Sequence, residues 1–129
     1  MNSIRVLLVD DHAPFRRLLL DFLSSHGSVV VVGEASNGTE AVEKADELIP
    51  DLVLMDLAMP GMSGFDATTA IKVKHPATRV VVLSSHVGEV YRRAALEHLA
   101  DGYIEKNSMK SGLQAVIESY PDTERRMAV

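Results

Sequence analysis

The chain contains no cysteine among its 129 residues. This absence excludes disulfide bonds, thiol catalysis and thiolate metal sites within the sequence, and it is consistent with a reducing compartment. Basic residues are also in the minority, because 13 Lys and Arg stand against 18 Asp and Glu and give a formal net charge of −5. This acidic balance argues against direct nucleic acid binding by the domain.

Long apolar runs are missing as well. The first apolar run, residues 4–9, is too short for a signal peptide and is followed by two acidic residues, and no run approaches the length of a membrane helix. No internal repeat, low-complexity tract or linker interrupts the chain, and 47% hydrophobic residues are enough for one core. We therefore expect one cytoplasmic domain over residues 1–121 without membrane contact, followed by a C-terminal tail over residues 122–129.

Short apolar runs alternate with segments of helical periodicity. Pro14 suits the first turn of the first helix, Asn37 with Glu40 is typical of a helix start, and Ser108 is a candidate N-cap of the last helix. Strands joined by helices predict an α/β fold with a parallel sheet that is covered on both faces, but spacing alone leaves the strand order open. The expected strands are Ile4–Val9, Val29–Val32, Leu52–Asp56, Arg79–Leu83 and Tyr103–Glu105, and the expected helices follow each of them.

Apolar spacing also predicts which face of each helix is buried. The prediction for the helix over residues 89–100 places Val90, Ala94, Leu96 and Leu99 on or near its inner face. Candidates for the first two helices are Phe15, Leu18, Leu19, Phe22 and Leu23, and then Ala41, Val42, Ala45, Leu48 and Ile49.

The chain is organised around residues 51–64, DLVLMDLAMPGMSG. The apolar run Leu52–Met55 is typical of a strand buried on both faces, and Asp56 stands where that strand would end. Pro60, Gly61 and Gly64 then mark a loop. An acid at the carboxyl end of a central parallel strand lies where open α/β sheets hold their chemistry, although Asp56 could also be an ordinary loop aspartate.

Other strands are predicted to end in polar side chains too: Asp10 and Asp11, Ser84, and Lys106. In a parallel sheet these ends share one edge, so the residues can converge with Asp56. Three carboxylates repel one another, and Mg²⁺ relieves that repulsion because it prefers carboxylates, waters and phosphate oxygens as ligands. A lysine and a hydroxyl match the charge and hydrogen-bonding needs of a phosphoryl group. The set therefore predicts an aspartyl-phosphate site.

These residues carry a resemblance to a known family. The set Asp10-Asp11, residues 56–64 (DLAMPGMSG), Ser84 and residues 102–106 (GYIEK) resembles the receiver domain of bacterial two-component response regulators over Val6 to about Ile117. The resemblance implies a flavodoxin-like, doubly wound (βα)5 fold with a five-stranded parallel sheet in the order 2-1-3-4-5. It also implies transfer of a phosphoryl group to Asp56 from the phosphohistidine of a sensor histidine kinase or phosphotransfer protein.

Metal roles follow from the same resemblance. It implies that Asp11 and Asp56 bind Mg²⁺ directly, that Asp10 acts through water, and that the carbonyl of Ala58 completes the protein ligands. Such a domain catalyses its own phosphorylation and dephosphorylation but is a signalling switch rather than a turnover enzyme. It would control an output domain or a downstream protein, with a phosphorylation-dependent homodimer as a further option.

Switch roles are implied for three further residues. Lys106 would pair with the phosphoryl oxygens, Ser84 would be the hydroxyl that moves toward the phosphoryl group, and Tyr103 would be the aromatic whose rotamer follows. The output surface would lie between about Glu89 and Tyr120. Each assignment has an ordinary structural alternative. Asp10 could cap a helix, Lys106 could be a surface lysine, Ser85 could face inward in place of Ser84, and Tyr103 could serve only in packing.

The sequence departs from many receivers at Asn107, where they carry a proline after a cis peptide bond, so we do not expect that cis bond here. The stretches VDDHAPFR and VVLSSH resemble receivers joined to a helix-turn-helix output domain, so the chain is either a stand-alone receiver or one domain of a transcription factor. A haloacid-dehalogenase-like phosphatase would need an acid at Ala58. A flavin-binding electron carrier would need a hydroxyl- and glycine-rich loop where Asp10 and Asp11 stand. A phosphorylation-independent interaction module, a pseudo-receiver, is the alternative function.

Overall fold

The computed structural model describes residues 3–121. The expected tail over residues 122–129 lies outside the described residues. The strands are β1 (Ile4–Val9), β2 (Val29–Ala35), β3 (Leu52–Asp56), β4 (Arg79–Ser84) and β5 (Gly102–Glu105). The helices are α1 (Ala13–Ser24), α2 (Gly38–Leu48), α3 (Gly64–Lys74), α4 (Glu89–Glu97) and α5 (Met109–Glu118), with a short 3₁₀ turn, η1 (Lys106–Ser108), before α5.

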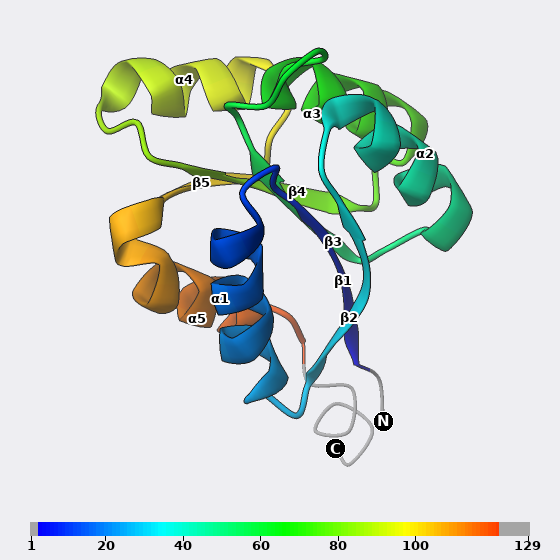
Figure 1. Ribbon diagram of the computed structural model, residues 1–129, viewed down its shortest axis with the longest axis vertical. Helices are drawn as coiled ribbons and strands as arrows, with labels where there is room; N and C mark the ends of the chain where they lie inside the picture. Colours follow the sequence, from blue (N-terminus) through cyan, green and yellow to red (C-terminus); the bar gives the residue numbers. More distant parts are fainter. Residues whose placement is uncertain (1–2, 122–129) are drawn as a thin grey trace.

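All neighbouring strands of the sheet are parallel, and their order is β2-β1-β3-β4-β5. Helices α1 and α5 cover one face, while α2, α3 and α4 cover the other (Figure 1). The predicted α/β class and the flavodoxin-like strand order are therefore confirmed. Because every strand runs in the same direction, the carboxyl ends of β1, β3, β4 and β5 meet at one edge of the sheet, which we call the carboxyl edge.

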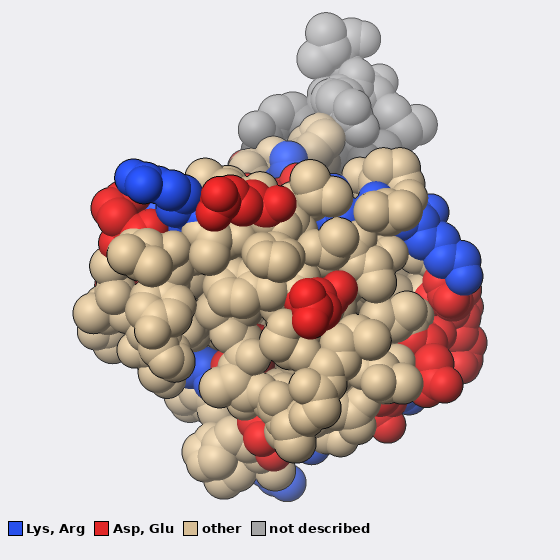
Figure 2. Space-filling model, turned by 90° about the horizontal axis from the view of Figure 1, so that it is seen from above, with Lys and Arg blue, Asp and Glu red and all other residues tan. Residues whose placement is uncertain are grey.

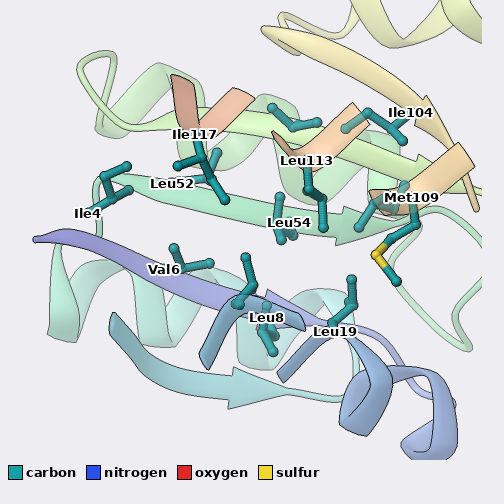
Figure 3. Packing of buried hydrophobic residues seen from close by; sticks show 13 residues of the cluster. Ile4, Val6, Leu8, Leu19, Leu52, Leu54, Ile104, Met109, Leu113 and Ile117 are labelled. Atoms are coloured by element: carbon teal, nitrogen blue, oxygen red, sulfur yellow. The ribbon is translucent and has the colours of Figure 1, made fainter. Parts of the chain in front are cut away.

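Strand alternation divides the core into two layers. Val6 and Leu8 of β1 and Leu54 of β3 point toward α1 and α5, whereas Leu7 and Val9 point toward the opposite helices. Figure 3 shows the first layer, in which strand side chains pack against helix residues. In β1 and β3 the buried apolar runs stop at Val9 and Met55, so Asp10 and Asp56 stand where these runs end.

Of two predicted N-caps, Asn37 and Ser108, the structure confirms one. Asn37 caps α2 as predicted, because its Oδ1 accepts a hydrogen bond from the Glu40 N–H at 2.8 Å. The Glu40 carboxylate in turn accepts from the Ser36 N–H at 2.7 Å. The prediction for Ser108 is wrong, because its side chain makes no capping bond to α5. The turn η1 precedes α5, so the chain enters that helix from a tighter turn that leaves Ser108 no capping role.

The predicted inner face of α4 is wrong for three of its four residues, since only Ala94 is partly buried. Val90 is 77% exposed, Leu96 57% and Leu99 48%, whereas Ala95 is fully buried. The inward side of α4 carries Ala95 and the partly buried Tyr91, which pack in one cluster with Tyr103 of β5. It ends at Glu97 rather than at residue 100.

Two more predicted core residues are exposed. Ile49 is 52% exposed because it is the C-cap of α2 and adopts a left-handed conformation with φ of 45°. Leu18 of α1 is 48% exposed, at the margin of the stripe whose buried members are Leu19 and Leu23. Strand β2 extends to Ala35, three residues beyond the prediction. No helix within residues 3–121 has the length and apolar composition of a membrane span.

Gly64 sets the loop that follows Asp56. Its N–H donates to the Leu57 carbonyl at 3.3 Å, and a Cβ atom at this position would collide with the carbonyl oxygen of Asp56. Only glycine permits this approach, so the start of α3 lies directly against the end of β3. Ser63 then caps α3 by accepting from the Asp66 N–H at 3.2 Å. The close contact holds the end of β3 in place.

Candidate functional site

Three carboxylates meet at the carboxyl edge. Oxygen atoms of Asp10, Asp11 and Asp56 all lie within 4.8 Å of one another. Asp10 is 1% exposed and Asp56 4% exposed, while Asp11 faces solvent. Buried like charges at this separation disfavour joint ionisation, so the cluster requires nearby positive charge.

Lys106 supplies part of that charge from the end of β5. Its Nζ donates to Asp10 Oδ2 at 2.9 Å and lies 3.3 Å from Asp56 Oδ1. The same Nζ lies 4.3 Å from the centre of the Phe15 ring, so an aromatic face stabilises the cation from a further side. The lysine therefore lies against the acidic cluster, not at the open surface.

The electrostatic environment shifts both partners. Burial and the negative charge of Asp10 raise the pKa of Asp56 above its ordinary value, although Lys106 acts in the opposite direction. Burial alone would lower the pKa of Lys106, but the hydrogen bond to Asp10 and the charges of Asp56 and Asp10 outweigh it and raise that pKa. Lys106 stays charged. The ionised form of Asp56 is disfavoured unless a further positive charge, such as a cation, binds at the acidic cluster.

The carboxylate of Asp10 is occupied on both oxygens. Oδ1 accepts from the His12 N–H at 2.8 Å, and Oδ2 accepts from Lys106. The alternative role of Asp10 as a helix cap is not what the geometry shows, since the N-cap of α1 is His12 and the bond closes the turn before the helix. Asp10 has little free capacity for direct metal binding, and the exposed Asp11 has more.

Ser84 ends β4 next to this cluster, because its neighbour Leu83 pairs with Asp56 in the sheet register. Ser84 is 1% exposed and Ser85 faces solvent, so Ser84 is the inward-facing serine. Its Oγ accepts from the His86 N–H at 3.0 Å. The hydroxyl is thus engaged with the β4–α4 loop.

Tyr103 reaches the same loop from β5. Its hydroxyl donates to the His86 carbonyl at 2.6 Å, and the ring is buried among Leu57, Val82 and Ala95. His86 therefore joins the serine and the tyrosine through its own N–H and C=O, and its ring centroid lies 4.4 Å from that of Tyr91 in α4. Sequence reasoning missed this connection, because a backbone group leaves no residue-specific signal.

An open cleft of about 450 Å³ lies beside the lysine, and its lining residues are His12, Phe15, Ser85, Lys106 and Asn107. It gives a solvent-side approach to the acidic cluster from the β1–α1 and β5–α5 loops. The peptide bond before Asn107 is trans, and no cis bond occurs within residues 3–121. This agrees with the expectation that the proline-linked cis bond of other receivers is absent.

The donor set fits a hard divalent cation. Oxygen donors dominate the cluster, which matches Mg²⁺ and not the nitrogen- and sulfur-rich sites of zinc. Ala58 lies exposed in the loop two residues beyond Asp56, and the role of its carbonyl stays a prediction. Sequence reasoning missed Arg16, which contacts the backbone of Asp10. Its only signal is its place one turn into α1, which aims long side chains back toward the strand end.

Comparisons with known proteins agree with this geometry. The family model of the response regulator receiver domain matches residues 6–118. Response regulator protein VraR of Staphylococcus saprophyticus is 43% identical over 120 residues, which cover 91% of this chain and 56% of VraR. The VraR of Staphylococcus aureus strain NCTC 8325 is 46% identical over 108 residues, 82% of this chain and 51% of that protein. The chain thus spans about half the length of these curated relatives.

Solved structures show the same fold. The signal receiver domain of response regulator NarL from Mycobacterium tuberculosis has a TM-score of 0.83 and 32% identity, covering 93% of this chain and 100% of that one. A LuxR-family two-component response regulator from Aurantimonas sp. SI85-9A1 has a TM-score of 0.86 and 34% identity, covering 92% and 84%. The family model matches nearly all of the described residues. The chain therefore belongs to the receiver domains of two-component response regulators.

Proposed function

We propose that Asp56 accepts a phosphoryl group, in a Mg²⁺-dependent reaction, from the phosphohistidine of a sensor histidine kinase or phosphotransfer protein in the cytoplasm. The observation that supports this most directly is the meeting of Asp10, Asp11, Asp56 and Lys106 at the carboxyl edge. A pair of buried, repelling carboxylates beside one lysine is unfavourable for stability alone, but it suits a site that binds a cation and a phosphoryl group.

The reaction is an in-line displacement at phosphorus. A carboxylate oxygen of Asp56 forms the new O–P bond, the N–P bond of the donor breaks, and its electron pair stays on the imidazole nitrogen. The raised pKa of Asp56 makes the attacking oxygen more basic, and Lys106 neutralises charge on the phosphoryl oxygens. Asp11 and Asp56 would hold Mg²⁺ directly, Asp10 would hold it through water, and the Ala58 carbonyl would complete the protein ligands. The ion would offset further negative charge on the phosphoryl oxygens.

Phosphorylation would then act on the β4–α4 loop. The Ser84 hydroxyl would give up the hydrogen bond from the His86 N–H and donate to a phosphoryl oxygen instead. Tyr103, whose hydroxyl donates to the His86 carbonyl, would then change rotamer. The affected surface runs from about Glu89 to Tyr120 and includes α4, whose apolar Val90 and Leu96 are exposed. Figure 2, viewed from above Figure 1, shows a face on which uncharged residues predominate.

The partner of this surface is an output domain or a downstream protein, and a second phosphorylated copy is a further option. The match covers only about half the length of these relatives, which favours a response regulator whose receiver controls an attached domain. The pseudo-receiver alternative has less support, since an interaction module that ignores phosphorylation has no need of the complete acid, lysine and hydroxyl set.

Labelling with acetyl phosphate tests the proposal. Intact mass spectrometry of the parent protein with acetyl phosphate and Mg²⁺ should show the addition of one phosphoryl group, and EDTA should abolish it. The addition should vanish in Asp56→Asn and persist in the matched control Asp66→Asn, which alters an exposed acid of the same loop–helix junction. Equal labelling of Asp56→Asn and the parent would refute Asp56 as the acceptor.

A further inference from the structure

Arg16 joins three elements behind the acidic cluster. From the first turns of α1, its Nη1 donates to the carbonyl oxygen of Asp10 at 2.5 Å. Its Nε donates to Glu34 Oε1 of β2 at 2.8 Å, and the arginine side chain is only 21% exposed. The guanidinium therefore connects the end of β1 to the end of β2 and lies beneath the loop that carries the acids.

The bond to the Asp10 carbonyl completes the restraint of that residue. The Asp10 N–H donates to the Ala35 carbonyl at 3.0 Å, and both carboxylate oxygens accept hydrogen bonds, as described above. With Arg16 on the carbonyl, every polar group of Asp10 has a partner. The bonded carbonyl belongs to the peptide that joins Asp10 to Asp11, so this bond fixes the plane of that peptide.

Asp11 depends on this peptide for its direction. Within residues 3–121 its carboxylate takes part in no hydrogen bond or ion pair, and it faces solvent. Nothing in the described part of the chain orients this side chain except its own backbone. A change in the tilt of the preceding peptide would therefore move the Asp11 carboxylate relative to Asp56.

We propose that Arg16, itself set by Glu34, is a positioning residue that aims the Asp11 carboxylate at the metal site; this rests on the proposed Mg²⁺ function. Partners behind metal ligands fix ligand orientation in this way, and their loss weakens metal binding. Arg16 would affect Mg²⁺ binding only through the peptide between Asp10 and Asp11, and it is not a ligand of the ion. Its fork geometry suits the task, because one guanidinium satisfies a carbonyl and a carboxylate at once.

Electrostatics would act in the opposite direction. A positive charge near the site repels Mg²⁺, so removing Arg16 would strengthen binding if charge alone mattered. Glu34 lies 2.8 Å from the guanidinium and offsets most of that charge, so the positional effect should dominate. Arg17 is the matched control, because it is the next residue and exposed, and its side chain has no hydrogen bond or ion pair to residues 3–121.

Calorimetric titration of the purified protein with Mg²⁺ tests this without relying on phosphorylation. Arg16→Gln should weaken Mg²⁺ binding by about tenfold, Arg16→Lys by less because one donor remains, and Arg17→Gln should match the parent or bind slightly more tightly. Glu34→Ala, which leaves the guanidinium unanchored and its charge unbalanced, should weaken binding as well. Arg16→Lys keeps the charge, so weakening in that variant reports position alone, and it serves if Arg16→Gln folds poorly.

The outcomes separate this inference from the proposed function. Mg²⁺ binding by the parent with unchanged affinity in both Arg16→Gln and Glu34→Ala overturns the positioning role alone. Equal weakening in Arg17→Gln and Arg16→Gln also overturns it, because Arg17 makes no hydrogen bond with Asp10 and the effect would then not come from the bond to the Asp10 carbonyl. A parent protein that binds no Mg²⁺ overturns the metal site and the positioning role together.

Discussion

Lys106 Nζ lies 2.9 Å from Asp10 Oδ2 and 3.3 Å from Asp56 Oδ1, so one ammonium group connects two buried carboxylates, one just after β1 and one at the end of β3. Removing it leaves like charges buried without compensation. We expect Lys106→Met to lower the free energy of unfolding in EDTA by about 3 kcal/mol, the scale for a buried pair that loses one partner.

Millimolar Mg²⁺ should recover part of that loss, since a bound cation supplies the missing charge. Urea unfolding with and without Mg²⁺ measures both effects, and Lys110→Met, on the exposed side of α5, is the control. A Lys106→Met protein as stable as the parent in EDTA would show that the ammonium group does not hold the carboxylates together.

Asp56 should reduce the stability of the metal-free fold at neutral pH. Burial and Asp10 raise its pKa above the ordinary value of 3.8, so the folded state binds the proton more tightly than the unfolded state does. The ionised carboxylate therefore destabilises the fold, fully above the raised pKa and not at all below the unfolded one.

Asp56→Asn removes this charge while keeping the shape. In EDTA at neutral pH it should raise the free energy of unfolding by about 1 kcal/mol, a typical size for one substitution. The gain should shrink as the pH falls toward the ordinary value, which urea unfolding at a series of pH values would follow. A neutral-pH destabilisation by Asp56→Asn would contradict the assigned direction of the pKa shift.

Magnesium should stabilise the fold by mass action. An ion that binds the native state alone raises the free energy of unfolding by about 2.7 kcal/mol at a concentration one hundred times its dissociation constant. Thermal unfolding should therefore show a melting temperature that rises with Mg²⁺ in the parent and rises much less in Asp11→Ala. Asp21→Ala, an exposed acid of α1, should respond as the parent does. Equal shifts in Asp11→Ala and the parent would place the ion elsewhere.

Ser84 should carry the signal to α4. Its Oγ accepts from the His86 N–H, and the His86 carbonyl accepts from Tyr103, so release of the serine changes a loop that holds both. Hydrogen exchange with and without beryllofluoride, a phosphoryl mimic, should change over about residues 89–120 in the parent. Ser84→Ala should bind the mimic but lose the α4 response, while Ser85→Ala should keep it. A full response in Ser84→Ala would exclude this route.

The sequence predicted the carboxyl ends of β1, β3, β4 and β5 to within one residue, because strands buried on both faces leave apolar runs that stop abruptly at polar residues. Asp10, Asp56, Ser84 and Lys106 could be placed at one edge on that basis. Which carboxylate the lysine would approach more closely could not be predicted. That depends on side-chain geometry at an edge where several partners compete.

Helix α4 shows where periodicity fails. Its small inward residue, Ala95, gives a weaker pattern than Val90 and Leu96, which are exposed. Ala95 and Tyr91 of α4 pack with Tyr103 of β5, a contact between elements that a pattern within the helix cannot contain. Arg16 was missed for a related reason, since its partner Asp10 follows β1 and its partner Glu34 lies on β2.

The central claim is that Asp56 carries the phosphoryl group, and peptide mapping tests it most directly. The parent protein is incubated with acetyl phosphate and Mg²⁺, reduced with borohydride, which converts an acyl phosphate to homoserine, and then digested for tandem mass spectrometry. The claim predicts homoserine at position 56 alone, dependent on Mg²⁺. Homoserine at Asp10 or Asp11 instead, or an unmodified Asp56 in protein shown by intact mass to be phosphorylated, would contradict it.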